Sequence, residues 1–158
     1  MEKFHFHFYD WESKAANEPF LRQPFGDNWE ITTWGEAGQT ARKLATGLKS
    51  LGLPPKSHIG WVSKNCSEWI IEDIAIIMAG YISVPLYPTL DAKQINEVIR
   101  LGDVEALIVG KIENWEAMKD GIPDGMPMIT MPHYEGASKI TEGQQWDDFI
   151  NKFDPIKE

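Results

Sequence analysis

The chain has 158 residues and a mass of 18.0 kDa, which suits one ordinary domain or one part of a larger protein. Its composition, 42% hydrophobic and 25% charged, excludes a disordered tail and predicts a folded core. The formal charge of -9 argues against nucleic acid or an anionic membrane surface as a partner, because phosphate binding needs clustered lysine and arginine.

The acidic charge is concentrated near the C-terminus. Residues 103–158 carry 12 Asp and Glu against 5 Lys, and we interpret this acidic third as solvated surface. A single cysteine, Cys66, excludes an internal disulfide framework and fits a reducing compartment. No signal sequence opens the chain and no apolar run approaches the roughly 20 residues of a membrane helix. These features predict a cytoplasmic protein without a transmembrane segment.

The first 33 residues predict a β arm. Phenylalanine alternates with histidine over residues 4–8, which is typical of a strand, and aromatic-rich residues 20–25 and 29–34 flank a Gly-Asp-Asn turn that indicates a hairpin. On one strand face, His5 and His7 could share a metal ion. Without a third ligand, a polar outer face is the favoured interpretation.

A helix is predicted to begin at Thr33. Thr33 and Glu36 form a capping box, in which each side chain satisfies a free backbone donor of the other residue. Apolar residues then recur at three- and four-residue intervals as far as Leu51, and Gly52 and Pro54 end the helix.

The rest of the chain alternates between strands and helices. Strands are predicted at residues 58–63, 82–86, 104–109 and 126–131, and helices at 65–79, 91–101, 111–119 and 144–153. Strands that recur every 22 to 24 residues with helices between them require parallel pairing. The predicted fold is therefore α/β, a layered and mostly parallel sheet with helices on both faces, preceded by a short β-hairpin arm.

Motifs of catalysis are absent from the sequence. No strand is followed by a glycine-rich phosphate loop, and no nucleophile elbow is present. His58 and His133 are isolated, and we interpret Cys66 as a small buried residue because no base accompanies it. No catalytic or metal-binding residue is therefore assigned.

Two groups of side chains leave more than one interpretation open. Glu68, Glu72 and Asp73 cluster on the most apolar helix, where we expect Glu68 to complement the helix N-terminus and the other two to reach a wet edge or a basic partner. Trp34 and Trp69 follow apolar stripes and are expected in the core, whereas two tryptophans of the acidic third could line a groove. Those two are Trp115 and Trp146.

Three segments carry a resemblance to a known family: ITTW at residues 31–34, IGWVSKN at 59–65 and AGYISVPLYPTL at 79–90. They resemble the opening of the adenylate-forming (AMP-binding) acyl-CoA synthetases. The Tyr-Pro-Thr form of the last segment is most similar to the long-chain fatty acid CoA ligase branch. The resemblance is close over residues 31–109 and general elsewhere.

The resemblance implies a two-step ligase that uses a fatty acid, ATP, magnesium and CoA. Its phosphate loop and C-terminal catalytic lysine do not occur in this sequence. We therefore expect residues 1–158 to be a single N-terminal α/β subdomain of a larger enzyme, with a β arm at 1–33 and an α/β body at 34–158. Alone it should be inactive and bind none of these cofactors tightly, its partner being the rest of the same polypeptide.

Two polar residues are candidates for a ligand cleft. Asn65 and Thr89 follow predicted strand ends, and open α/β sheets bind ligands outside the carboxyl ends of their strands. We predict that both line one wall of the acyl or CoA cleft of the parent enzyme. Peripheral membrane association of the parent, a stand-alone interaction module built on Trp115 and Trp146, and a ligase for an amino acid or aromatic acid all remain open.

Overall fold

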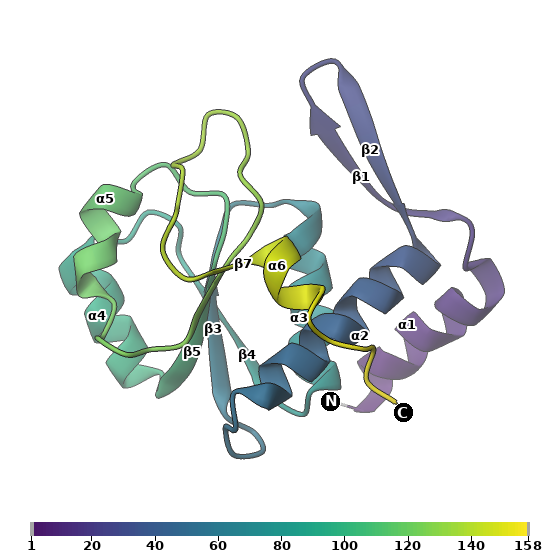
Figure 1. Ribbon diagram of the computed structural model, residues 1–158, viewed down its shortest axis with the longest axis horizontal. Helices are drawn as coiled ribbons and strands as arrows, with labels where there is room; N and C mark the ends of the chain where they lie inside the picture. The colour runs from purple at the N-terminus through teal and green to yellow at the C-terminus, as the bar shows by residue number, and fades with distance from the viewer. Residues whose placement is uncertain (1, 158) are drawn as a thin grey trace.

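A five-stranded parallel sheet forms the centre of the molecule (Figure 1). The computed structural model describes residues 2–157, with only the backbone for residues 2–6. The sheet has the order β4-β3-β5-β6-β7, and every neighbouring pair is parallel. Its strands are β3 (His58–Val62), β4 (Ile82–Leu86), β5 (Val104–Val109), β6 (Met128–Thr130) and β7 (Gln144–Gln145). The predicted α/β class and parallel sheet are confirmed.

Helices cover both faces of this sheet, which explains the continuous apolar runs of its central strands. On one face, Ile59 and Ile108 pack with helices α2 (Trp34–Ser50), α3 (Ser67–Met78) and α6 (Trp146–Ile150). On the other face, Leu107 and Val109 pack with α4 (Ala92–Leu101) and α5 (Trp115–Met118). A single 3-10 turn, η1 (Lys119–Gly121), follows α5.

The capping box predicted at Thr33 is present, and a second one lies at the start of α4. Thr33 caps α2, where its hydroxyl accepts a hydrogen bond from the Glu36 amide at 3.2 Å while the Glu36 carboxylate accepts one from the Thr33 amide at 2.8 Å. The bond from the Thr33 amide, and a second one from the Thr33 hydroxyl to the same carboxylate, lower the pKa of Glu36. Asp91 and Gln94 make the same reciprocal pair at the start of α4. Both helix starts are therefore fixed by local chemistry.

The strand predicted over residues 4–8 is wrong, because residues 2–15 form helix α1 (Glu2–Ala15). Helical spacing places Phe8 and Glu12 on one face. Phe8 is buried against Phe20 and Trp34, and Glu12 accepts two hydrogen bonds from Arg42 at 2.6 and 2.7 Å. These contacts with α2 favour the helix, and they outweigh the alternating pattern.

The hairpin is confirmed as β1 (Pro19–Phe25) paired antiparallel with β2 (Asn28–Thr33). Gly26 has a φ of 57°, which a side chain would disfavour. The hairpin forms a sheet of its own and extends away from the central sheet in Figure 1. A division of the chain at residue 33 stays a prediction.

The acidic third differs most from its prediction. Helices α5 and α6 are shorter than expected, and residues 144–145 form an edge strand. Trp115 and Trp146 are only 2% and 4% exposed and belong to the core clusters, although each also contributes to the lining of a surface cavity. Within residues 2–157, no helix combines the length and the apolarity needed to cross a bilayer.

Candidate functional site at the carboxyl edge of the sheet

The strand order places a topological switch point at β3. From β3 the chain crosses to β4 on one side and later returns to β5 on the other side. The loops that follow β3 and β5 therefore diverge, and in open α/β sheets such a divergence creates a crevice at the carboxyl edge. Both loops begin at this edge, after Val62 and Val109.

A small hydrogen-bond network holds the two loops together at the crevice. The Ser63 hydroxyl accepts a bond from the Lys111 amide at 2.9 Å and donates one to the Lys64 carbonyl at 2.7 Å. The Lys64 amide in turn donates to the Lys111 carbonyl at 2.8 Å. A Cβ at Gly110 would lie 2.6 Å from the Ser63 oxygen and 2.2 Å from Met131 sulfur, so this close approach requires glycine. No sequence motif marks Gly110, so this close approach was not predicted.

An open groove of about 620 Å³ lies over the carboxyl ends of β3 and β4. Trp61 and Trp69 form an edge-to-face pair with centroids 4.8 Å apart, and Trp61 donates a hydrogen bond to the Ser83 hydroxyl at 2.8 Å. The ring of Tyr87, which is 78% exposed, completes an apolar wall. The groove is lined by Trp61, Ser63, Lys64, Asn65, Trp69, Pro85, Leu86, Tyr87 and Pro88.

The two predicted cleft residues fall differently in this groove. Asn65 is exposed and lies in its lining, as expected for a residue after β3. Thr89 is exposed but lies beyond the lining, which ends at Pro88. A role for either residue in ligand binding stays a prediction.

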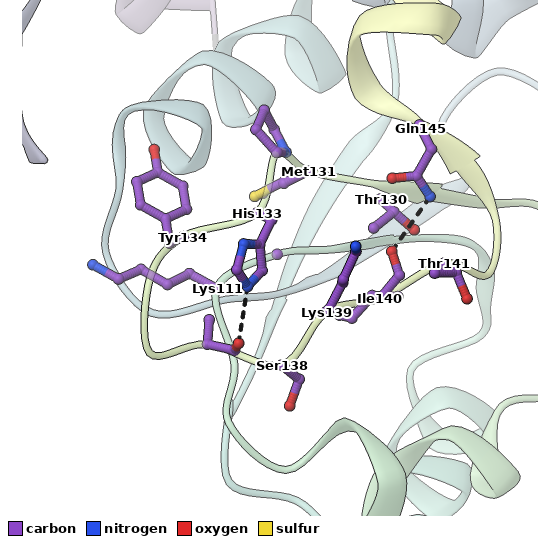
Figure 2. A pocket seen from close by; sticks show the side chains of 13 residues that line it. Lys111, Thr130, Met131, His133, Tyr134, Ser138, Lys139, Ile140, Thr141 and Gln145 are labelled. Carbon is purple, nitrogen blue, oxygen red and sulfur yellow. Dashed lines mark hydrogen bonds between the residues drawn. The ribbon is translucent and has the colours of Figure 1, made fainter.

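A second, smaller cavity of about 210 Å³ lies over the ends of β5 and β6 (Figure 2). Lys111 approaches it from β5, and His133, Tyr134 and Lys139 approach it from the loop that follows β6. His133 was predicted to be isolated, because no partner is visible in the sequence. The parallel pairing of β5 and β6 places Lys111 in the lining of the same cavity.

The start of α3 links the hairpin to this edge. Cys66 provides no side-chain cap, and instead the Gln23 amide oxygen accepts a hydrogen bond from the Ser67 amide at 3.1 Å. Glu68 accepts a hydrogen bond from the Tyr134 hydroxyl at 2.5 Å, and Tyr134 stacks on Phe25 with centroids 5.0 Å apart. Burial and then this bond to Glu68 raise the pKa of Tyr134.

Cys66, which immediately precedes α3, and Glu72, within α3, are both buried. Burial raises the pKa of the Cys66 thiol to about 11, so it lacks the thiolate of a nucleophile and agrees with the interpretation as a small buried residue. Glu72 was expected at a wet edge or beside a basic partner, and both expectations are wrong. Its side chain is fully buried and both oxygens lack a hydrogen-bond partner among residues 2–157. Burial, followed by Asp73 and Glu68, raises the pKa of Glu72 well above its ordinary value.

No set of three or more His, Cys, Asp or Glu within the described chain is placed to hold a metal ion. The possible pair of His5 and His7 required a strand, and this segment is helical. The side chain of His5 lies outside the described residues. His58 has a structural contact, since its Nδ1 lies 2.5 Å from the Gly102 carbonyl oxygen.

Comparison with known proteins decides the family. The family model for the AMP-binding enzymes matches residues 8–150, which is nearly the whole chain. This chain belongs to the AMP-binding enzyme family. Its relatives include the long-chain-fatty-acid–CoA ligase ACSBG2 of Rattus norvegicus, 27% identical over 84% of this chain and 20% of the relative. The long chain acyl-CoA synthetase 6, peroxisomal, of Arabidopsis thaliana is 37% identical over 51% of this chain and 11% of its own length.

The chain thus spans about a fifth of the length of the ACSBG2 ligase. Solved structures of a CoA ligase and an acyl-CoA synthetase share its fold. The anthranilate CoA ligase AuaEII in complex with anthranoyl-AMP superposes with a TM-score of 0.77 at 17% identity, over 96% of this chain and 28% of that chain. Acetoacetyl-CoA synthetase from Streptomyces lividans gives a TM-score of 0.77 at 17% identity, over 98% of this chain and 26% of the other.

Proposed function

We propose that this chain is the N-terminal portion of an ATP-dependent long-chain fatty acid CoA ligase. The observation that carries the proposal is the family match over residues 8–150, together with relatives called long-chain-fatty-acid–CoA ligases that align with 84% or more of the chain. In the parent, the fatty acid carboxylate attacks the α-phosphate of ATP and releases pyrophosphate. The CoA thiol then displaces AMP to give acyl-CoA.

In that enzyme, this chain supplies scaffold and one wall of the ligand cleft. The groove over β3 and β4 has an apolar surface built by Trp61, Trp69 and Tyr87, which suits an acyl chain or the arm of CoA. The Asn65 amide at its rim can donate to and accept from a polar group of the same ligand. Magnesium would assist the adenylation step in the parent, and no residue of this chain is assigned to hold it.

Adenylation by the chain alone is the decisive test. We expect the purified 158-residue chain to catalyse no ATP–pyrophosphate exchange with palmitate above the enzyme-free rate, because positioned phosphate-binding groups supply most of the catalysis of such transfers. The protein encoded by the complete gene should catalyse that exchange and form palmitoyl-CoA. Exchange by the isolated chain, or a complete protein that activates amino acids or aromatic acids but not palmitate, would contradict the proposal.

A variant of the complete protein tests whether the groove binds a substrate. Asn65→Ala should raise the KM for palmitate or CoA several-fold, as expected for one lost hydrogen bond of about 1 kcal/mol. Asn151→Ala is the matched control, since Asn151 is exposed at the end of α6 and lies outside the groove. Equal KM values in both variants would show that Asn65 does not contact the substrate.

The stand-alone interaction module is not favoured by the structure. That interpretation needed Trp115 and Trp146 as contact residues at the acidic surface. Both indoles are buried, and Trp115 donates a hydrogen bond to Glu142 at 2.9 Å. They stabilise the body and offer little area to a partner.

A further inference from the structure

The hairpin turns one face to the body of the molecule and the other to solvent. Gln23 and Phe25 of β1 face the body, where they bond to the start of α3 and stack on the loop that follows β6. Pro24 lies between them and is paired with Trp29, so the alternation of side chains places Trp29, and with it Ile31, on the opposite face. These two side chains are 64% and 48% exposed. The hairpin thus presents an apolar face to solvent, on a ribbon that extends away from the central sheet (Figure 1).

The outer edge of β2 also has unpaired backbone groups. In an antiparallel pair, the amide and carbonyl of successive residues point alternately toward the partner strand and away from it. The two-residue turn makes Phe25 and Asn28 a hydrogen-bonded pair, so Trp29 and Ile31 belong to pairs that are not hydrogen-bonded. Pro24, which has no amide proton, stands opposite Trp29, in agreement with this alternation. Within residues 2–157 neither the Trp29 nor the Ile31 amide has an acceptor outside the hairpin, so both point to solvent.

The two edges of the hairpin differ in their protection. Edge strands of soluble proteins are normally blunted by proline, by charge or by an irregular register, because free amides and carbonyls pair with other strands. The outer edge of β1 has all three features, in Pro24, Arg22 and the shift of register between Pro19 and Leu21. The strand β2 contains no proline and no extra residue, and its one charged residue, Glu30, faces the body. Such an open edge is typical of a strand that another strand covers.

We propose that the outer edge of β2 pairs with a third strand, supplied by the part of the parent enzyme that lies outside residues 1–158. The amides and carbonyls of Trp29 and Ile31 form the ladder, and apolar side chains of the third strand pack against their exposed side chains. The added strand stabilises the hairpin, because two strands alone are marginally stable. This inference rests on the proposed function only in taking the chain as part of a longer enzyme.

A strand of the same polypeptide suits this edge better than a second copy of the chain. Two β2 edges that pair with each other contribute six residues each, whereas a stable interface takes roughly 20–30 residues a side. A strand within one polypeptide needs no association of free molecules. The chain spans 20% of the length of the ACSBG2 ligase and 28% of the AuaEII structure, so enzymes of this kind have ample further chain to supply the strand.

Hydrogen exchange of single amides tests the pairing without any measurement of activity. In the 158-residue chain, we expect the Trp29 and Ile31 amides to exchange within about tenfold of the rate of an unfolded peptide, and the Glu30 amide, which bonds to β1, to exchange more slowly. In the protein encoded by the complete gene, the Trp29 and Ile31 amides should exchange at least about a hundredfold more slowly than in the 158-residue chain. Equal rates in the two proteins would overturn the proposal.

Proline variants of the complete protein separate backbone pairing from simple burial. Ile31→Pro removes one outward amide and should return exchange of the Trp29 amide to its rate in the 158-residue chain. Arg22→Pro is the matched control, since Arg22 is paired with Ile31 and its amide points outward from β1, so it should leave Trp29 protected. With the Glu30 amide still protected, persisting protection of Trp29 in Ile31→Pro would mean that no third strand pairs there. Where Ile31→Pro opens the hairpin, the comparison of the two unsubstituted proteins decides.

The remaining outcomes identify another occupant or separate the two proposals. Protection of Trp29 and Ile31 in the 158-residue chain that grows with protein concentration would assign the edge to a second copy and overturn the proposal. A complete protein that protects both amides but forms no palmitoyl-CoA would contradict the ligase proposal alone. One that forms palmitoyl-CoA with both amides unprotected would contradict the third strand alone.

Discussion

Glu72 combines two features that are unfavourable in a folded protein. Its carboxyl group is fully buried, and neither oxygen has a hydrogen-bond partner in the described chain. Burial disfavours the ionised form, and the nearby carboxylates of Asp73 and Glu68 disfavour it further. The raised pKa means that Glu72 is neutral in the folded protein at pH values where it is ionised in the unfolded chain.

The pH dependence of stability follows from that difference. As the pH rises above the ordinary glutamate value of 4.5, the unfolded chain loses a proton that folded Glu72 retains, so the free energy of unfolding falls until the raised pKa is reached. Glu72→Leu should remove this loss. It should raise the free energy of unfolding near pH 7 by about 1–3 kcal/mol, because two unsatisfied buried oxygens disappear.

Urea unfolding at pH 5 and pH 8 measures this effect. Glu97→Leu is the control, since Glu97 is exposed on α4 and should change stability by less than about 0.5 kcal/mol. A Glu72→Leu variant that is less stable than the parent at pH 8, or that keeps the parent's slope with pH, would show that Glu72 has a partner in solution.

Helix α3 illustrates how one element depends on another. Its first turn has no side-chain cap of its own, and the hairpin supplies one through Gln23, which is buried. Gln23→Ala should lower the free energy of unfolding by about 1 kcal/mol, the usual value of a lost helix cap. Arg22→Ala, on the exposed face of the same strand, should have little effect.

The contact has a structural readout as well as an energetic one. In Gln23→Ala, hydrogen exchange of the Ser67 amide should become faster, because its acceptor is removed. Unchanged exchange at Ser67, together with stability equal to that of Arg22→Ala, would mean that the hairpin does not cap α3 in solution.

At the scale of the whole molecule, the hairpin and the central sheet should differ in local stability. Strand β3 is paired on both sides and buried under helices on both faces, whereas β1 and β2 pair only with each other and expose Trp29 and Ile31. Isolated two-stranded hairpins are marginally stable. We expect amides of β3 and β5 to exchange only through global unfolding, and hairpin amides to exchange at least about tenfold faster through local opening.

Native-state hydrogen exchange at several low urea concentrations measures this difference. Hairpin amides should show little dependence on urea, and those of β3 and β5 should follow the urea dependence of global unfolding. Equal protection in both regions would show that the hairpin and the body open as one cooperative unit.

The elements that could be predicted from the sequence are those whose signals are local. The capping boxes at Thr33 and Asp91 and the apolar runs at 82–86 and 104–109 depend on neighbours within a few residues, and the structure has these elements at those places. The resemblance to the family could be recognised in the sequence because each of its segments is continuous in the chain.

The features that could not be predicted depend on residues that are distant along the chain. Helix α1 was not predicted, because its helical face is stabilised by contacts with Arg42 and Trp34 of α2. Trp115 and Trp146 are buried by packing against residues outside their own segments. The cavity over β5 and β6 arises because parallel pairing aligns the carboxyl ends of β5 and β6, which brings Lys111 beside the loop that carries Lys139. Contacts across such sequence separations are fixed by sheet order and side-chain packing, so local spacing carries no signal for them.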